Sequence, residues 1–132
     1  MSIGRTSTKY NITGMFVAKA ELLYTNTTQT TIVTLPADAV IWNVGLEIVT
    51  GFTGSGTDLL DIGVTTDTDK YLTGEDLTTP YFDSFLNGYV MSHNNATPDR
   101  MEASTNITFQ YTDQNSDAAA GQVFIYVHYT KH

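Results

Sequence analysis

The sequence contains no cysteine among its 132 residues. Disulfides, thiolate metal sites and a cysteine nucleophile are therefore excluded, and the absence fits synthesis in a reducing cytosol. A chain of this length forms one ordinary domain, which buries roughly 65 to 70 % of the surface that its unfolded chain exposes. The fold has to rest on a packed core.

Positive charge is scarce, because six Lys and Arg stand against 14 Asp and Glu, for a formal net charge of -8 at pH 7. Such a surface repels phosphate backbones, so we do not expect a nucleic-acid partner. Long apolar runs are also lacking, and no window reaches the about 18 apolar residues of a membrane-spanning helix. Residues 1–14 lack the apolar stretch of a secretory signal. We expect neither membrane insertion nor signal-directed export.

What the sequence has instead is alternation of apolar and polar residues. The period of two predicts strands over 15–24, 30–35, 40–48, 60–64, 106–112 and 123–129. The last of these is apolar or aromatic on both faces, which is typical of a central strand or of one that meets a partner. Short strands separated by turn residues predict an all-β fold, an antiparallel β-sandwich of jelly-roll or Greek-key type. We expect a short N-terminal arm over 1–14 and one sandwich domain over 15–132.

The segment from Val40 to Tyr71 shows the pattern most clearly. Its two alternating runs flank the turn residues 52–57, which predicts a hairpin whose inner faces share one core. Trp42 is in phase with the apolar positions of the first run, so we expect it in the core; a sugar-stacking platform would need it exposed. Between Asp67 and Met91 the alternation fails, and we expect a long irregular connection with an acidic start. A helical turn after Pro80 is the less favoured alternative.

Two groups of residues are candidates for contacts between chains. The polar N-terminal arm is expected to add to or clamp a neighbouring subunit. An aromatic cluster after Pro80 is expected to seal an oligomer contact, since such clusters more often pack or bind a subunit than bind a ligand. The predicted interface residues are Ile3, Arg5, Lys9, Tyr10, Tyr81, Phe82, Phe85 and Tyr89.

Metal and catalytic sites are not predicted. Asp67 and Asp69 are the candidates for Ca²⁺, but they lack the register of an EF-hand loop. The preferred interpretation is that they hold a turn through Asx hydrogen bonds while Lys70 pairs with one of them. The histidines show no metal-ligand spacing, and Ser55 stands between two strands, whereas a nucleophile elbow joins a strand to a helix. We therefore expect no catalytic residue, no cofactor and no enzyme.

Three stretches carry a family resemblance: LPADAVIWNV at 35–44, FTGSGTDLLDIG at 52–63 and TDTDKYL at 66–72. Together they resemble small virion structural proteins of tailed bacteriophages, of the head decoration or cement kind. The resemblance implies a β-sandwich that multimerises on a phage particle. Its partners would be the major capsid protein or other virion proteins, with synthesis in the bacterial cytoplasm.

The expected function is thus that of a non-enzymatic virion protein that forms a homo-oligomer, with a trimer favoured, and stabilises the capsid surface. Weak contacts repeated by symmetry suffice for this task. The alternatives are a carbohydrate- or receptor-binding β-sandwich, a tail or head-completion component, and, less favoured, a hydrolase that uses acidic residues or a bound metal.

Overall fold

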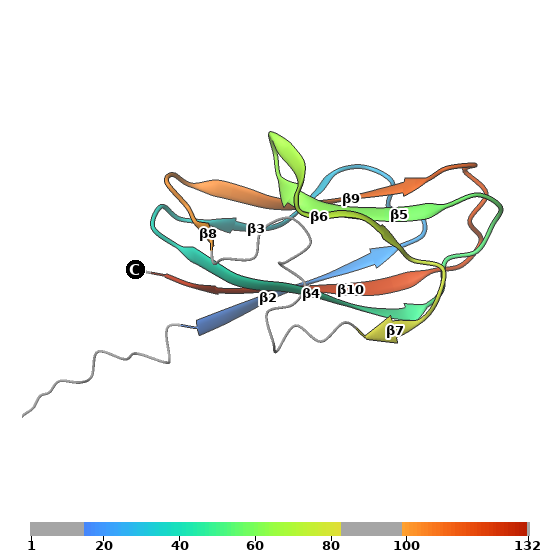
Figure 1. Ribbon diagram of the computed structural model, residues 1–132, viewed down its shortest axis with the longest axis horizontal. Helices are drawn as coiled ribbons and strands as arrows, with labels where there is room; N and C mark the ends of the chain where they lie inside the picture. The colour runs from blue at the N-terminus through green and yellow to red at the C-terminus, as the bar shows by residue number, and fades with distance from the viewer. Residues whose placement is uncertain (1–14, 83–98, 132) are drawn as a thin grey trace, which may run out of the picture.

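A computed structural model describes residues 15–82 and 99–131. These residues form two antiparallel sheets that lie one above the other in Figure 1. The strands are β2 (Met15–Leu23), β3 (Thr30–Leu35), β4 (Val40–Thr50), β5 (Asp58–Val64), β6 (Asp67–Asp76), β7 (Tyr81–Phe82), β8 (Asp99–Arg100), β9 (Thr105–Asp113) and β10 (Gln122–Thr130). One sheet has the order β2-β10-β4-β7, with the short β8 also paired to β4, and the other has the order β3-β9-β5-β6.

The strand order is that of a jelly roll. Counted along the chain with β8 left aside, the strands run 1-8-3-6 in one sheet and 2-7-4-5 in the other. Successive long strands alternate between the sheets except β5 and β6, which pair with each other, and the last strand returns to lie beside the first, as two nested Greek keys require. The predicted all-β sandwich is confirmed, and β10 is the central strand that its two apolar faces indicated.

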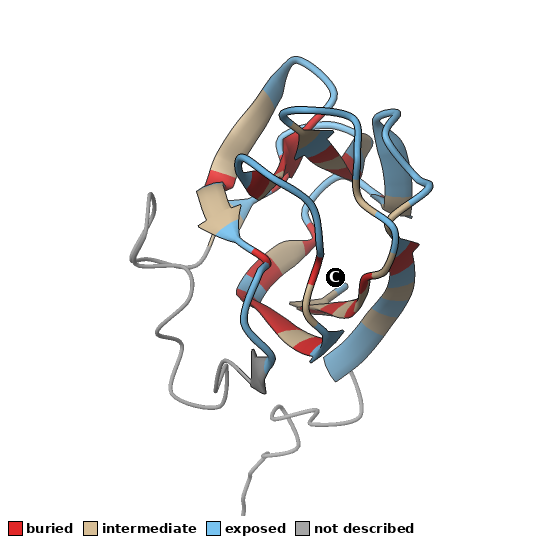
Figure 2. Cartoon of the chain, turned by 90° about the vertical axis from the view of Figure 1, so that its right-hand side faces the viewer, coloured by how far each residue is buried: buried red, intermediate tan, exposed pale blue. Residues whose placement is uncertain are grey.

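The core lies between the two sheets and follows the alternation read from the sequence. Figure 2 shows buried positions as red stripes that alternate with tan and blue ones along the strands. From β10 the buried hydrophobic side chains are Val123, Ile125 and Val127, and from β9 they are Ile107, Phe109 and Tyr111. The alternation predicts the β9 set, because side chains on a strand point to opposite faces in turn. In β10 both faces are apolar or aromatic, so only the structure shows which face points inward.

Two predictions about the middle of the chain are wrong. The runs in β4 and β5 do not pair as a hairpin, since β4 lies in one sheet and β5 in the other. The turn residues between them cross the sandwich, so the two inner faces do share one core, but across the layers. The acidic start of the predicted long connection is strand β6, which pairs with β5 from Val64↔Asp67 to Leu59↔Asp76. Register shifts in this pair hide the alternation from a sequence search.

One end of the sandwich is held together by the loops 51–57 and 114–121. The Asp117 carboxylate accepts hydrogen bonds from the backbone N–H and the hydroxyl of Ser55, both at 2.9 Å. These two donors lower the pKa of Asp117. Gly121 (φ +154°) lies so close to Phe52 that a Cβ there would come within 2.5 Å of the ring. The loops thus close the core over Phe52, whose ring meets that of Tyr111 edge-on at 4.9 Å.

In the described part of the chain, the structure has no helix that is long and apolar enough to cross a membrane.

Candidate interaction surface

The outward surface of the β2-β10-β4 sheet carries apolar side chains where solvent would favour polar ones. The register pairs Phe124 with Glu21 and Glu47, and Tyr126 with Lys19 and Gly45, so these residues share the outer face. Val17 and Leu23 of β2 lie on the same face and are exposed at 52% and 39%. We call Val17, Leu23, Trp42, Phe124 and Tyr126 the apolar face.

Trp42 belongs to this surface and not to the core, which corrects the prediction. A register shift lies between His128 and Tyr129, whose partners on β4 are Asn43 and Ile41, so Trp42 is the extra residue of a β-bulge. The bulge reverses the phase of the strand and places Ile41 in the core while Trp42 is 45% exposed. The indole Nε1–H donates to Thr130 Oγ1 at 2.9 Å, which fixes the ring beside the last residue of β10.

Charged groups on the apolar face are tied to its aromatic and polar side chains. The Lys19 ammonium lies 4.3 Å from the centroid of the Phe124 ring, within the range of a cation–π contact. The Gln122 amide donates to the Glu21 carboxylate at 2.6 Å. Burial and the nearby Glu47 carboxylate raise the pKa of Tyr126. The face thus combines exposed apolar side chains with a few polar contacts that order them.

The outer surface of the other sheet has a different character. The Thr34 hydroxyl donates to Asn106 Oδ1 at 2.7 Å, and the Gln29 amide donates to the Thr108 hydroxyl at 3.1 Å. The Gln110 side chain donates to the backbone carbonyl of Thr27 at 3.0 Å. All of the large hydrophobic side chains that are exposed among the described residues belong to β2 and β4 of the first sheet, and none to this one. Of the two outer surfaces, the apolar face is the one suited to association.

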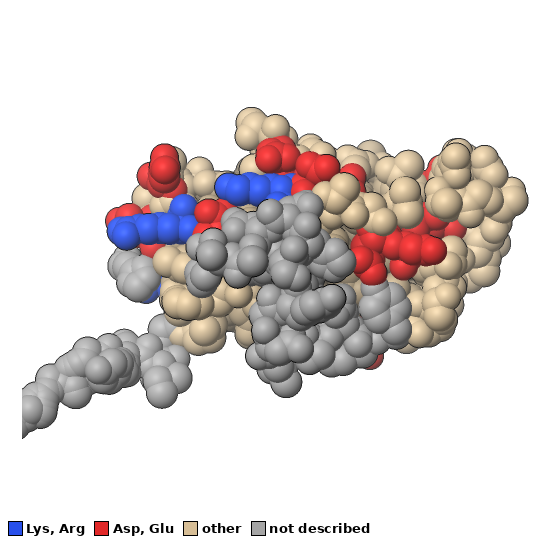
Figure 3. Space-filling model, viewed as in Figure 1, with Lys and Arg blue, Asp and Glu red and all other residues tan. Residues whose placement is uncertain are grey.

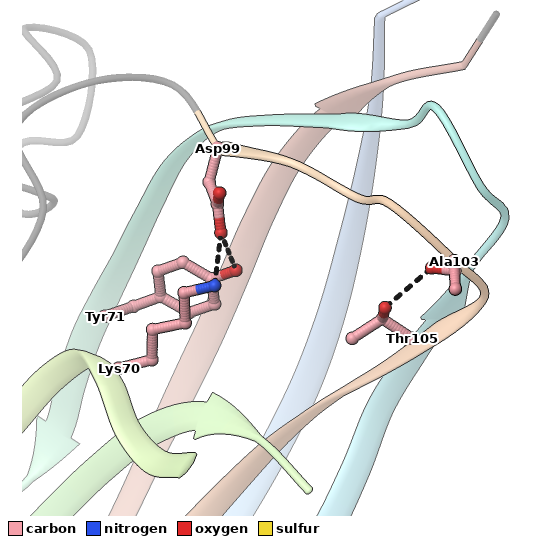
Figure 4. A network of polar contacts seen from close by, with 5 residues as sticks. All are labelled: Lys70, Tyr71, Asp99, Ala103 and Thr105. Atoms are coloured by element: carbon pink, nitrogen blue, oxygen red, sulfur yellow. Dashed lines mark hydrogen bonds and ion pairs between the residues drawn. The ribbon is translucent and has the colours of Figure 1, made fainter. Parts of the chain in front are cut away.

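A polar cluster lies at the end of the sandwich where β6 meets β8 (Figure 4). The hydroxyl of the buried Tyr71 donates to Asp99 Oδ2 at 2.6 Å, and the Lys70 ammonium lies 3.0 Å from the same oxygen. Burial, and then the hydrogen bond to Asp99, raise the pKa of Tyr71, so the phenol stays protonated. Both groups that face Asp99 are donors, and the cluster links the two strands.

The sequence interpretation paired Lys70 with Asp67 or Asp69, and this is wrong because its partner comes from β8, 29 residues further along the chain. Arg100 makes a second ion pair with Asp38 at 2.8 Å, and both side chains are exposed. Figure 3 shows the blue Lys and Arg side chains beside red acidic ones on the left of the view, with further acidic side chains to the right. A groove of about 430 Å³ lies beside the cluster, between Lys70 and Thr105.

The sequence-predicted site residues fall into three sets. Ile3, Arg5, Lys9, Tyr10, Phe85 and Tyr89 lie outside the described residues. The backbones of Tyr81 and Phe82 form β7, where Tyr81 pairs with Ile48 and Phe82 with Glu47 of β4. This places part of the predicted aromatic cluster at the edge of the sheet that carries the apolar face.

Asp67 and Asp69 lie in strand β6 and not in the predicted loop. Asp69 accepts from the Thr73 hydroxyl at 3.4 Å. Within residues 15–82 and 99–131, no three His, Cys, Asp or Glu side chains gather where they would hold one metal ion. The two aspartates remain the sequence-based Ca²⁺ candidates.

Comparison with solved structures gives the same fold in two phage capsids. A chain of the acidic stable capsid structure of Helicobacter pylori bacteriophage KHP30 matches with a TM-score of 0.66 and 17% identity, over 89% of this chain and 87% of that one. A chain of the cyanophage Pam1 capsid asymmetric unit matches with a TM-score of 0.65 and 17% identity, over 98% of this chain and 94% of that one. The fold is shared with phage capsid structures. No protein-family model matches the chain, and no curated protein matches it.

Sequence reasoning missed the residues that build the apolar face. Val17 and Leu23 fall on the polar side of the alternation in β2, beside Lys19 and Glu21, so the alternation alone does not indicate a contact surface there. The signal was present, because apolar residues on both faces of β2 are what a strand with a covered outer face shows. Trp42 was missed because a bulge cannot be read from periodicity alone.

Proposed function

We propose that this protein is a non-enzymatic virion structural protein that forms a homo-oligomer and binds the capsid surface as a decoration or stabilising protein. Three observations support the proposal: the resemblance of the sequence to small virion proteins, a jelly-roll fold shared with chains of two phage capsid structures, and an outer surface suited to association. None of them depends on a reactive centre.

The observation that carries the proposal is the difference between the two outer surfaces of the sandwich. One presents Val17, Leu23 and Trp42, each at least 39% exposed, beside Phe124 and Tyr126, and the other presents mutually bonded hydroxyls and amides. Apolar area on a single face stabilises association with a partner on that side, and the polar face stays in water. Such one-sidedness is what a protein that lies on a particle surface needs.

The N-terminal segment supplies the second contact of the proposed mechanism. Residues 1–14 contain Arg5 and Lys9 and none of the acidic residues, whereas the rest of the chain holds all 14 acids and the other four cations. The segment is thus +2 and the remainder 4 - 14 = -10, so electrostatics favours contact of the arm with the body of a neighbouring copy. Aromatic residues from Tyr81 to Tyr89 seal the oligomer, with a trimer as the expected state.

The test uses particles of the phage that encodes this chain. The wild-type protein should be found in purified particles by mass spectrometry and should bind stripped particles in co-sedimentation. A chain that starts at Gly14 should keep its far-UV circular dichroism and melting temperature but bind more weakly. Leu23→Asp on the apolar face should also bind more weakly, while the matched control Thr112→Asp on the polar face should bind like wild type.

Absence of the protein from particles, together with no binding by the wild type, would refute the proposal. Gold labelling of particles in electron microscopy separates a position on the head from one on the tail. Either outcome leaves the protein in the virion and changes only the symmetry of its site.

A second function is favoured by one observation. Trp42 is 45% exposed, with its ring fixed by the bond to Thr130, and exposed indoles of this kind stack on sugar rings. A carbohydrate-binding role predicts that oligosaccharides shift the fluorescence of this single tryptophan, and that Trp42→Ala removes binding. A flat titration across a glycan panel removes this candidate and leaves the virion proposal untouched.

A further inference from the structure

Strand β2 is an edge strand with an unusual surface. Among the described residues it pairs only with β10, so one row of its backbone N–H and C=O groups faces away from the sheet. Four of the six large hydrophobic side chains that are exposed in the described chain belong to it. They are Met15 at 44%, Phe16 at 38%, Val17 at 52% and Leu23 at 39%.

The other edges of the sandwich are protected in the usual ways. The pairing of β3 with β9 and that of β6 with β5 both contain register shifts, and β7 is only two residues long. Bulges and short strands make an edge a poor template for a further strand. The pairing of β2 with β10 runs through all nine residues without a shift. A long, regular and apolar edge is a surface that invites a partner strand.

The sequence of β2 is complementary to itself about Ala20. When two copies run antiparallel with paired residue numbers that sum to 40, Lys19 lies opposite Glu21, and Val17 lies opposite Leu23. Because the pair is two-fold symmetric, each of these contacts occurs twice. Opposite charges and apolar pairs directly across from each other stabilise antiparallel strands.

We infer that a second copy of this chain binds at the free edge of β2, antiparallel and in the register centred on Ala20. The contact joins the two β2-β10-β4 sheets into one continuous sheet and covers the exposed apolar side chains of both edges. This two-fold contact deepens the homo-oligomer of the proposed function and is made by residues other than those proposed for the arm and the aromatic cluster. It is therefore compatible with a trimer formed elsewhere on the molecule.

Neighbouring registers are unfavourable. A shift by one residue sets an outward side chain of one copy opposite an inward side chain of the other, which breaks the common face of the sheet. A sum of 38 places Lys19 opposite its own copy, and a sum of 42 does the same to Glu21. Like charges directly opposite each other destabilise a strand pair, so the charges select the register centred on Ala20.

Lys and Glu on an edge strand also have a protective use, since charged side chains discourage strand addition. A charge swap distinguishes the two roles. Lys19→Glu sets four carboxylates across the contact, and Glu21→Lys sets four ammonium groups there. The double variant Lys19→Glu with Glu21→Lys restores both attractive pairs with their signs reversed. Protective charges predict no recovery in the double variant, whereas the inferred pairing requires it.

The experiment measures self-association of the full chain by sedimentation velocity over a dilution series, with circular dichroism as a check on folding. Each single variant should raise the dissociation constant of the two-fold contact about tenfold or more, and the double variant should return it to near the wild-type value. A wild-type chain that shows no two-fold association up to about 1 mM would overturn the inference. Single variants that associate like wild type would also overturn it.

A crosslink tests the register itself. The chain has no cysteine, so Ala20→Cys introduces a single thiol that meets its own copy at the two-fold axis. Opposed residues in antiparallel strands have Cα atoms about 4.5 to 5.5 Å apart, within the range of a disulfide. Oxidation should give a covalent dimer far faster than with the control Thr112→Cys, and equal rates would contradict the register. Particle binding is assayed separately. If the β2 edge does not pair but the protein still binds particles, this inference is refuted and the proposed function is not.

Discussion

The hydrogen bond between Tyr111 and Asp58 offers a sharp test of what stabilises the sandwich. The Tyr111 hydroxyl donates to Asp58 Oδ1 at 2.7 Å, and both residues are only 1% exposed. Tyr111→Phe removes the hydroxyl and leaves the ring, so the edge-on contact with Phe52 is kept and no large cavity forms. The change therefore isolates one buried hydrogen bond to a carboxylate.

The expected cost follows from the charge of the acceptor. A hydrogen bond to a charged group contributes about 1.5 to 3 kcal/mol, and removal of one partner from a buried ion pair costs about 3 to 5 kcal/mol. A phenol is neutral, so we expect the loss in unfolding free energy to lie near 2 to 3 kcal/mol. At this chain length 1 kcal/mol corresponds to roughly 3 to 5 °C, so the melting temperature should fall by about 6 to 15 °C.

The assay is thermal and urea unfolding followed by circular dichroism, with Tyr126→Phe as the matched control. The Tyr126 hydroxyl lies 3.5 Å from Glu47 Oε1, at the limit of a hydrogen bond, and its loss should change stability by no more than about 0.5 kcal/mol. Adding Asp58→Asn to Tyr111→Phe should recover part of the loss, because the uncompensated charge is then gone. A Tyr111→Phe effect as small as the control would refute the reasoning.

Two further predictions concern pH and a single glycine. Burial raises the pKa of Tyr71 and of Tyr111 above the ordinary value near 10, so above pH 10 these side chains ionise in the unfolded chain but stay protonated in the fold. The free energy that these two phenols contribute to folding is therefore fully present below about pH 10. Above that pH the unfolding free energy should fall by about 1.4 kcal/mol per pH unit for each tyrosine. Urea titrations over this pH range should find a smaller slope in Tyr71→Phe than in the wild type. Gly121→Ala should cost about 1 to 3 kcal/mol in the same titrations, because its Cβ would lie 2.5 Å from a core ring and its φ is +154°. The control Gly74→Ala, with φ +62° and open space around it, should lose only about 1 kcal/mol; equal losses at both glycines would contradict the packing argument.

Much of the fold followed from local pattern, and the failures have physical causes. Strand β3 ends at Leu35, before Pro36, as predicted, because proline lacks the N–H that a ladder needs. The sequence pattern predicts a loop where β6 lies, because bulges in its pairing with β5 break the period of two. The partner of Lys70 was missed because nothing local indicates that Asp99 lies beside it.

The residues of the apolar face were harder to predict from the sequence than the fold was. The sequence predicts a protein that binds other subunits, with aromatic residues after Pro80 in the interface, but it does not indicate Val17 or Leu23. Their importance depends on the place of β2 at the sheet edge, which is a fact about strand order. Strand order is set by contacts between residues far apart in the chain, and periodicity carries no information about it.

By itself, the sequence determined the all-β class, most strand positions and many of the inward side chains, because alternation and turn residues act between near neighbours. It also determined the self-complementary order of side chains in β2. Only the tertiary structure decided that β4 and β5 belong to opposite sheets, that Trp42 faces solvent, and that β2 has one unpaired edge among the residues that the structure describes. These depend on which distant segments meet, and that choice comes from packing the whole core at once.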